Sequence, residues 1–398
     1  MPTVSRFLIV QQCAKRVRMM TTWHLITGEY PPQHGGVSDY TRLVAHGLAA
    51  CGDQVHVWAP ECRTELPSPS GVILHRLPGH FSPRALTCLD AALRRQPRPF
   101  RLLVQYVPHM YGWKAMNLPF CLWLAQQRQP APWVMFHEVA FPCSWKQQLV
   151  HNVLGAVTHV MAGIVARSAE QVFVSIPGWI QMLRRIAPRQ RRITWLPIPS
   201  TIATAVPPDS VQRVRADMLQ NGRTRVVGHF GTFSSVIHQQ LSEIMPQILR
   251  HQDRVGMLIG RNSRHFLKQL MQREPSLSGR VFAGEDLSAE DVAAHLAACD
   301  VLVQPYPDGA SSRRTSLMAG LALGQPIVTT YGRLSEPVWQ DDFVGLAQCG
   351  DLTTMVNLVE QILADDAQRR RLADRAKAAY QRYFSIERTI QTLRDMSM

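Results

Sequence analysis

The chain has 398 residues, 46% hydrophobic and 18% charged, which excludes a disordered protein and is long enough for two domains. Its net charge of +14 is uneven, because residues 1–200 carry 21 Lys and Arg against 8 Asp and Glu, while residues 201–398 carry 22 against 21. A basic half predicts an anionic partner, such as a phosphorylated acceptor or an acidic membrane, although an arginine-rich composition explains it equally well. No zinc-finger or RNA-binding motif is present, so nucleic acid is not expected as a partner.

The cysteines and the apolar runs indicate in which cellular compartment the protein is expected. Eight cysteines lack paired spacing, which indicates neither a disulfide framework nor a zinc ribbon and fits a reducing cytoplasm. The apolar runs at 118–125 and 153–166 are shorter than the roughly 20 residues of a spanning helix. Residues 1–18 lack the apolar core and cleavage site of a signal peptide, so we interpret them as a flexible extension.

Strand-like and helix-like segments alternate along the whole chain. In the first half, apolar strands are expected at 22–27, 55–60, 102–108, 133–138, 171–176 and 192–200. The first strand is followed by a helix at 37–52, with Ser38 as a plausible N-cap. After a Pro-rich linker at 197–209, strands are expected at 226–233, 255–260, 281–284, 300–307 and 325–330. This rhythm predicts an α/β protein with two doubly wound, parallel-sheet domains.

Ligands of such sheets bind beyond the carboxyl ends of the strands, so the strand-to-helix loops are candidate sites. In the first half, Gly35 and Gly36 precede a helix and let backbone amides approach an anion, although a plain turn also explains the pair. His137 and Glu138 end a buried strand, where a structural histidine is equally ordinary. The dinucleotide fingerprint G-x-G-x-x-G is absent, which argues against a dehydrogenase.

A loop at 105–117 is rich in aromatic residues. Tyr106, His109 and Tyr111 have the composition of a surface that grips a sugar or a lipid-linked phosphate, so they are candidate acceptor contacts. A membrane-facing rim and plain core packing are the two alternatives.

In the second half, small and basic residues follow three strands. Gly231 and Thr232 follow the first strand, and Arg261 and Asn262 follow the second. The strand at 300–307 is followed by a loop that opens the next helix. Ser311 and Ser312 are its expected caps, and Arg313, Arg314 and Thr315 are expected in its first turn. Arginine at a helix N-terminus is unfavourable by about 0.3–1 kcal/mol, so two of them predict a bound anion such as a pyrophosphate. The alternative is that either arginine points to water or pairs with Asp308.

The segments 28–60 and 298–330, with "GRLSEPVW" at 332–339, together resemble the GT-B glycosyltransferases of retaining family four (glycosyl transferases group 1). The resemblance extends from Thr21 to the end of the chain. It implies two Rossmann-like domains facing across a cleft: an acceptor domain at 19–200 and a nucleotide-sugar donor domain at 201–378. It also implies a last helix, 379–398, that crosses back to the first domain.

Several site residues are carried over from the resemblance. It places Gly35 and Gly36 at the donor phosphates and His137 beside the transferred sugar. We also expect Ser38, Asp39 and Glu138 to contact the acceptor.

The chain departs from the family at two places. Ser311 and Ala319 occupy the positions of the family's two glutamates, and Thr232 and His238 lie where it has Arg and Lys. We expect Arg261, Arg313 and Arg314 to hold the diphosphate instead, Ser311 to address the sugar, and Glu336 to bond the ribose or the sugar. For Glu336, a plain helix-entry acid is an equal alternative.

These observations predict a metal-independent, retaining hexosyltransferase without a cofactor, using Arg313, Arg314 and His137 in catalysis. Its acceptor is expected to be an anionic or lipid-linked saccharide, and its location the cytoplasm, with peripheral contact at the inner face of the membrane. The alternatives are a non-catalytic sugar-nucleotide-binding homologue, favoured by the missing glutamates, and a GT-B epimerase or phosphorylase.

Overall fold

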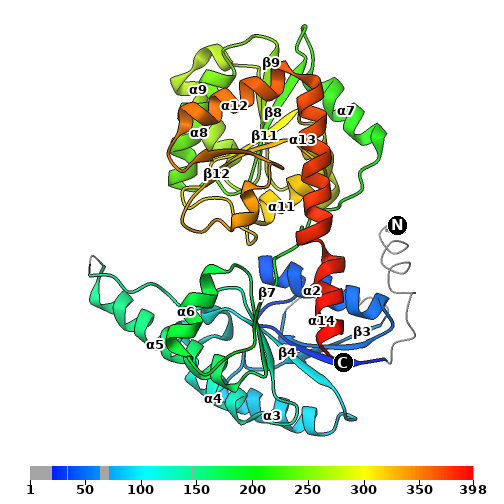
Figure 1. Cartoon of the computed structure of the whole chain (residues 1–398), viewed down its shortest axis with the longest axis vertical. Coiled ribbons are helices and arrows are strands. Elements are labelled where there is room, and N and C mark those ends of the chain that lie inside the picture. Colours follow the sequence, from blue (N-terminus) through cyan, green and yellow to red (C-terminus); the bar gives the residue numbers. More distant parts are fainter. Residues whose placement is uncertain (1–19, 34, 63–70, 146, 398) are drawn as a thin grey trace. The chain divides into compact units, whose positions relative to one another are not determined.

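The computed structural model describes residues 20–33, 35–62, 71–145 and 147–397 (Figure 1). The chain forms two compact units: unit 1 runs to Pro197 and resumes at Thr389, and unit 2 is Ile198–Arg388. The expected extension at 1–18 lies outside the described residues.

Unit 1 contains a parallel seven-stranded sheet in the order β3-β2-β1-β4-β5-β6-β7. Its strands are β1 (Thr22–Ile26), β2 (Gln54–Pro60), β3 (Val72–Leu77), β4 (Arg101–Tyr106), β5 (Trp133–Phe136), β6 (Gln171–Val174) and β7 (Ile193–Trp195). The sequence analysis missed β3, which is an edge strand. Its mixed sequence VILHRL leaves Ile73 exposed, so it does not read as a buried apolar run.

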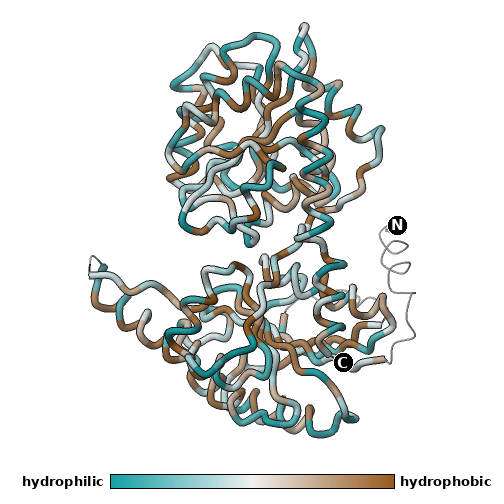
Figure 2. Tube along the Cα trace, in the orientation of Figure 1, coloured by the Kyte–Doolittle hydropathy of each residue, from teal (hydrophilic) through white to brown (hydrophobic). Residues whose placement is uncertain are grey.

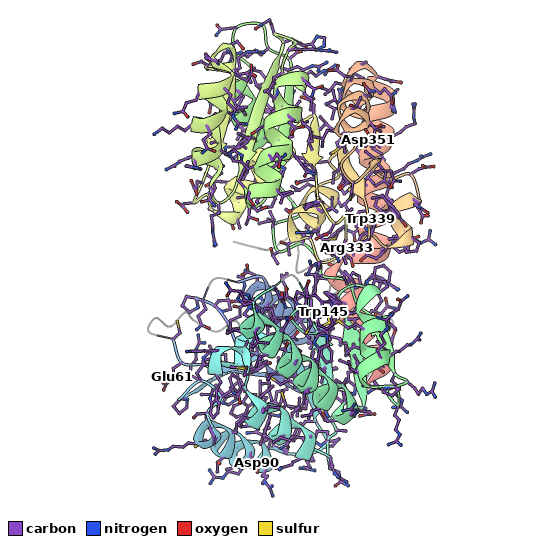
Figure 3. The ribbon with its side chains drawn as sticks, turned by 90° about the vertical axis from the view of Figure 1, so that its left-hand side faces the viewer. Glu61, Asp90, Trp145, Arg333, Trp339 and Asp351 are labelled. Atoms are coloured by element: carbon purple, nitrogen blue, oxygen red, sulfur yellow. The ribbon has the colours of Figure 1, made fainter. Side chains whose placement is uncertain are left out.

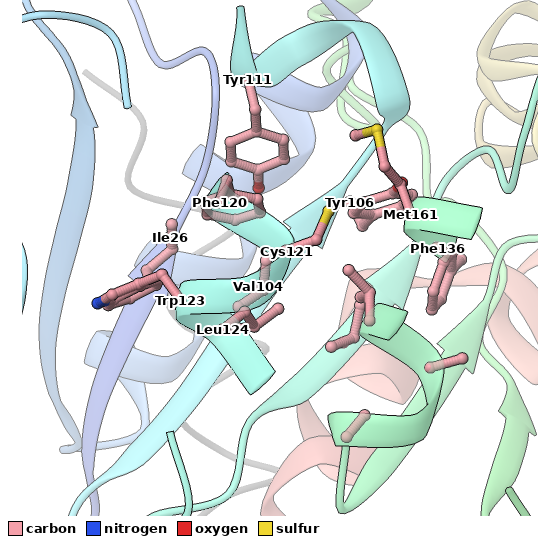
Figure 4. Packing of buried hydrophobic residues seen from close by; sticks show 14 of the residues in the cluster. Ile26, Val104, Tyr106, Tyr111, Phe120, Cys121, Trp123, Leu124, Phe136 and Met161 are labelled. Atoms are coloured by element: carbon pink, nitrogen blue, oxygen red, sulfur yellow. The ribbon is translucent and has the colours of Figure 1, made fainter. Parts of the chain in front are cut away.

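Helices connect most of these strands, as expected for parallel pairing. They are α2 (Gly36–Ala50), α3 (Pro83–Arg94), α4 (Leu118–Gln126), α5 (Leu149–Ser168) and α6 (Gly178–Ile186), with short 3-10 helices at Pro108–Tyr111 and Trp113–Ala115. Residues from α3, α4, α5 and α6 pack against β4, β5 and β6 in one apolar core (Figure 4).

Unit 2 contains a parallel six-stranded sheet in the order β10-β9-β8-β11-β12-β13. Its strands are β8 (Arg225–Phe230), β9 (Arg254–Ile259), β10 (Val281–Gly284), β11 (Val301–Gln304), β12 (Ile327–Tyr331) and β13 (Gly345–Gln348). The short strand β13, with sequence GLAQ, was also missed and is again an edge strand. Both sheets confirm the predicted α/β class.

Helices cover both faces of the second sheet. They are α7 (Pro208–Met218), α8 (Ser235–Ile248), α9 (Ser263–Arg273), α10 (Ala289–Ala297), α11 (Thr315–Ala322), α12 (Leu352–Ala364) and α13 (Asp366–Ala379), with 3-10 helices at Pro275–Leu277 and Pro337–Gln340. Side chains of α8 and α12 pack on Val301 and Val303. Gly320 of α11 lies against Leu302, which points to the opposite face, and a Cβ there would meet the Leu302 side chain at 2.8 Å.

The end of the chain stays with unit 2 longer than expected. A π-helical turn, Tyr380–Phe384, follows α13, and the Tyr380 hydroxyl accepts a hydrogen bond from the Ser200 amide at 3.1 Å. The Phe384 ring stacks on Trp339 at 5.5 Å. These contacts hold the chain in unit 2, and it rejoins unit 1 only at Thr389, inside α14 (Ile386–Met396). Within unit 1, Arg394 of α14 pairs with buried Asp53 at 3.1 Å.

The strand orders fix where ligands are expected. In each sheet the connections reverse direction once, between β1 and β4 in unit 1 and between β8 and β11 in unit 2. The loops after such neighbouring strands diverge to opposite faces and leave a crevice at the carboxyl edge of the sheet. The candidate site is therefore sought after β8 and β11 in unit 2, and after β1 and β4 in unit 1.

Candidate active site

At the switch point of unit 2, β8 brings a histidine that the sequence analysis did not select. His229 is buried, and burial lowers its pKa to about 4, so the ring is neutral at pH 7. Its Nδ1 lies 2.8 Å from the Val303 carbonyl oxygen, which accepts only from an N–H, so the proton sits on Nδ1. Nε2 is then a bare acceptor, and it has no partner among the described residues.

The neighbouring strand β11 ends in a second buried group with spare capacity. Gln304 donates from Nε2 to the Phe230 carbonyl at 3.0 Å, which ties the ends of β8 and β11 together. Its Oε1 is buried and finds no donor in the described part of the chain. Buried polar atoms without a partner are uncommon in folded proteins, and a water, an ion or a ligand is able to complete them.

The loop after β11 adds an aromatic ring and a guanidinium. The Tyr306 hydroxyl lies 2.8 Å from Ser316 Oγ, and the Arg314 guanidinium lies over the Tyr306 ring, 4.8 Å from its centroid. The Ser316 Oγ and His229 Nε2 both lie beside Gly231, within 3.7 Å of where its Cβ would be. The Nε of Arg314 has no hydrogen-bond acceptor among the described residues. The stacking on Tyr306 holds the guanidinium near the strand ends.

Ser311 is wholly buried in the same loop, and its Oγ has no partner within the described residues. We call the group formed by these side chains the switch-point cluster: His229, Gln304, Tyr306, Ser311, Arg314 and Ser316. It joins neutral acceptors, hydroxyls and one positive charge at the carboxyl ends of β8 and β11, a combination suited to hydroxyl groups and a phosphate.

A buried carboxylate shapes the loop before α11. Glu336 accepts hydrogen bonds from the Ser312 amide at 3.0 Å, from the Ser312 hydroxyl, and from Trp339 Nε1 at 2.6 Å. Burial raises its pKa, and the hydrogen bonds from Ser312 and Trp339 oppose that rise. Both carboxylate oxygens accept hydrogen bonds from the chain, so Glu336 positions the loop. The expected contact of Glu336 with the ribose or the sugar stays a prediction.

Close packing explains the glycine in this loop. Gly309 has φ of 92°, and a Cβ there would overlap Ser335 and Gly332. The helix also starts later than predicted: α11 begins at Thr315, with Arg314 in the N-cap position, so Ser311 and Ser312 are loop residues and not caps. Asp308, the predicted alternative partner of the arginines, pairs with Arg333 at 2.8 Å.

The remaining candidates of unit 2 lie along the same sheet edge. Arg261 and Asn262 follow β9 and are exposed, and the Asn262 amide donates to the Glu285 carboxylate at 2.6 Å. Thr232 follows β8 and is also exposed. Gly231 and Gly260 are in backbone contact, since a Cβ on Gly260 would overlap the Gly231 carbonyl. This approach joins the loops after β8 and β9 beside the switch-point cluster.

In unit 1, the glycine loop already holds an anion from the chain itself. The Glu29 carboxylate accepts hydrogen bonds from the amides of Val37 at 3.1 Å and Ser38 at 2.9 Å, in the first turn of α2. A Cβ on Gly35 would overlap that carboxylate, which explains the glycine there. Gly35 is the N-cap residue, and Ser38, expected as the N-cap, instead donates from its Oγ to the Gln33 carbonyl at 2.7 Å. Glu29 thus caps two amides that directly follow the glycine pair expected to meet the donor phosphates.

His137 lies at the end of β5, where the sequence predicted it. It is buried, and burial lowers its pKa to about 3, so it is neutral. Its Nε2 lies 2.9 Å from Gln105 Oε1, and its ring meets Tyr40 edge-on at 4.9 Å. The Gln105 Nε2 and the Tyr106 hydroxyl, at the neighbouring end of β4, have no partner among the described residues.

The aromatic loop after β4 is mostly core. Tyr111 is wholly buried, stacks on Phe120 at 3.9 Å, and donates from its hydroxyl to the Gln105 carbonyl at 2.5 Å (Figure 4). Tyr106 is equally buried. Both side chains pack in the core, so the predicted acceptor contact of Tyr111 is corrected. For Tyr106, only the hydroxyl remains as a group that could contact the acceptor. His109 is exposed, Glu138 half-buried, and the Asp39 carboxylate lies 3.8 Å from Arg42.

Sequence reasoning missed four members of the switch-point cluster: His229, Gln304, Tyr306 and Ser316. His229 and Gln304 each stand as a polar residue in a largely apolar strand, and the strand order that makes them neighbours is not visible in the sequence. Among the described residues, no group of three or more His, Cys, Asp or Glu side chains is arranged to hold a metal ion.

Each of the two units contains a parallel sheet whose strand order reverses once. Two units of this kind are the architecture of the GT-B fold. Solved structures share it over nearly the whole chain: sucrose-phosphate synthase from Thermosynechococcus elongatus has a TM-score of 0.73 and 19% identity over 95% of this chain and 98% of that one. Anabaena HepE in complex with UDP and glucose has a TM-score of 0.65 and 14% identity over 95% of this chain and 99% of that one. WaaG, a glycosyltransferase involved in lipopolysaccharide biosynthesis, has a TM-score of 0.63 and 15% identity over 94% of this chain and 99% of that one. No protein-family model and no curated protein sequence matches the chain.

Proposed function

We propose that this protein is a glycosyltransferase that moves a sugar from a nucleotide-sugar donor to an acceptor with retention of configuration. The observation that carries the proposal is the switch-point cluster, in which three buried polar atoms lack partners beside a stacked arginine. Similar structures include a complex with UDP and glucose and one with UDP-glucose, which supports a nucleotide sugar as the ligand.

The cluster divides into two parts with different tasks. Gln304 Oε1 and His229 Nε2 accept hydrogen bonds, and Ser311 Oγ both donates and accepts, so they suit sugar or ribose hydroxyls. Arg313 and Arg314 come directly before α11 and suit the diphosphate, because guanidinium groups bind phosphate through paired hydrogen bonds. Thr315 at the start of α11, and Thr232, Arg261 and Asn262 at the same sheet edge, are further proposed contacts.

This division gives a reaction that needs no carboxylate nucleophile. The bond between the anomeric carbon and the phosphate oxygen breaks, and its electron pair leaves with the nucleoside diphosphate. The arginines stabilise that developing charge, which is the larger part of such catalysis. The acceptor oxygen bonds to the anomeric carbon on the face that the leaving group vacates, and its proton passes to an oxygen of the departing phosphate. We propose that the reaction proceeds without an essential metal ion.

The acceptor is assigned to unit 1. We propose that His137, neutral and held by Gln105, hydrogen-bonds the transferred sugar. Glu138, His109, Ser38 and Asp39 are the proposed acceptor contacts. We propose an anionic or lipid-linked saccharide as acceptor, at the inner face of the membrane, because the basic excess of the chain lies in its first half.

Titration calorimetry with UDP, GDP and ADP tests the donor site. The wild type is expected to bind one of them, and Arg314→Met to bind it at least about tenfold more weakly, the loss of one charge-assisted contact. Arg333→Met is the matched control, since Arg333 is spent on Asp308, and it should bind like the wild type. Equal affinity of wild type and Arg314→Met, or no binding of any nucleotide, would contradict the assignment.

Incubation with a panel of nucleotide sugars tests the reaction. Release of nucleoside diphosphate that depends on an acceptor extract and persists in EDTA is expected, and the proton coupling at the anomeric carbon of the product reports the configuration. Ser311 and Ala319 replace two carboxylates, which favours a sugar-nucleotide-binding protein as the second candidate. Tight donor binding with no release under any acceptor would establish that alternative.

A further inference from the structure

The helix α5 exposes an unusual apolar surface. Leu149 is 78% exposed, Val153 52% and Val160 57%, and Ala156 is exposed as well. These four residues are spaced by four, three and four positions, so they form one stripe about 16 Å long on one face of the helix. Figure 1 shows the first half of α5 extending beyond the sheet of its own unit, and Figure 2 draws it mostly in brown and white.

A tryptophan extends the stripe at its amino end. Trp145 is fully exposed, and it precedes α5 in a segment that is fastened to the helix (Figure 3). The Asn152 side chain accepts from the Ser144 amide at 2.9 Å and donates to the Ser144 carbonyl at 3.0 Å. These two bonds hold the backbone beside Trp145 on the first turns of α5. We call Trp145, Leu149, Val153, Ala156 and Val160 the α5 stripe.

The opposite side of the helix is occupied by the core of unit 1. Met161, Ala162 and Val165 are buried in the core cluster, and the Thr158 hydroxyl accepts from the Phe141 amide at 3.1 Å. Among the described helices, α5 alone is long and apolar enough to cross a membrane by length and composition. Because its second half packs in the core of a folded unit, α5 is suited to lie on a bilayer and not to span it.

The segment of the chain that contains the stripe is basic. Residues 139–208 contain seven Lys and Arg and a single acidic residue, Glu170. Glu170 is separated from the stripe along the chain and lies near Arg101 and Arg192, at 3.6 and 3.5 Å. An apolar strip with a tryptophan, within a basic and nearly acid-free segment, is complementary to the interface of an anionic bilayer.

We propose that the α5 stripe docks this protein on an anionic phospholipid bilayer, with α5 lying along the interface. A second copy of the chain is a poorer occupant, because a twofold interface would bring two basic segments together, each with a single acidic residue as counter-charge. The proposal does not depend on sugar transfer, since it concerns a surface outside the switch-point cluster and is tested without a donor or an acceptor.

Cosedimentation with vesicles tests the proposal. The wild type is expected to sediment with vesicles of two parts phosphatidylcholine to one part phosphatidylglycerol, and more weakly in high salt. The triple variant Trp145→Ser, Leu149→Gln, Val153→Gln should partition at least about tenfold less, since it removes three apolar side chains from the interface. All three side chains are more than half exposed, so circular dichroism should show an unchanged fold.

The control carries a change of the same kind elsewhere on unit 1. Leu122 on α4 is 53% exposed, so Leu122→Gln removes an equally exposed apolar group and should leave vesicle binding unchanged. Retention of the wild type in the supernatant, or equal binding of the triple variant, would overturn the proposal. A concentration-dependent dimer in sedimentation velocity that the triple variant loses, with no vesicle binding, would assign the stripe to a second copy and overturn it as well.

Discussion

The Glu336 carboxylate gives the sharpest test of how the candidate site is held. Replacing it by Ala removes the acceptor of the Ser312 amide, the Ser312 hydroxyl and the Trp339 indole N–H. Each of the two N–H groups loses a buried charged acceptor, at a cost of about 1–3 kcal/mol. Relief from burying a carboxylate offsets part of this cost, so we expect unit 2 to lose about 2–4 kcal/mol of unfolding free energy.

Hydrogen exchange measured by mass spectrometry reads this effect at the loop itself. Opening of the Ser312 amide should become easier in Glu336→Ala, and its exchange should accelerate by about thirtyfold or more. The midpoint of urea unfolding should fall, and the affinity for the nucleoside diphosphate should fall with it, because the loop carries Ser311 and Arg314.

Glu285→Ala is the matched control. Its carboxylate also accepts a backbone N–H, from Asn262 at 2.6 Å, but on the open surface, where water replaces it. We expect a loss below about 1 kcal/mol for this variant. If Glu336→Ala and Glu285→Ala were equally stable, or if exchange at Ser312 were unchanged, Glu336 would not be the group that positions the loop.

Two further predictions concern unit 1. Glu29→Ala leaves the amides of Val37 and Ser38 without their acceptor, so the melting temperature should drop by an amount corresponding to about 1 kcal/mol, while Glu61→Ala, an exposed acid (Figure 3), should not change it. Added pyrophosphate should restore part of the loss if these amides accept an anion, and an unchanged melting temperature of Glu29→Ala would refute the capping role. Stability should also fall in acid, because burial lowers the pKa of His24 to about 3, with smaller contributions from His56 and His75, whose own pKa values burial also lowers. The folded state keeps His24 neutral while the unfolded chain takes up a proton, so the contribution of His24 to stability is full above pH 6.5 and decreases by about 1.4 kcal/mol per pH unit as the pH falls toward 3. Urea midpoints at pH 7 and pH 5 check this, and His24→Gln should have a flatter pH dependence; parallel dependences would contradict it.

Local patterns were sufficient for most of the fold. Continuous apolar runs such as those of β1 and β11 mark strands buried on both faces, and their alternation with helices requires parallel pairing. The edge strands β3 and β13 were not predicted, because an edge strand has fewer neighbours and tolerates polar or glycine residues, so its sequence lacks a continuous apolar run. The late return of the chain at Thr389 depends on contacts of Tyr380 and Phe384 with distant residues, which no local pattern encodes.

For the candidate site, too, some features could be predicted from the sequence and others only from the structure. Sequence alone located the loops after the strands and the arginines before α11, because residue type and spacing carry that information. Only the tertiary structure showed that His229 and Gln304 meet at the switch point, that Glu336 is spent on Ser312 and Trp339, that Glu29 caps α2, and that Tyr111 is core. The physical reason is that burial and hydrogen-bond partners are properties of neighbours in space. A sequence states which groups a chain has, and the fold decides which of them are already satisfied and which remain for a ligand.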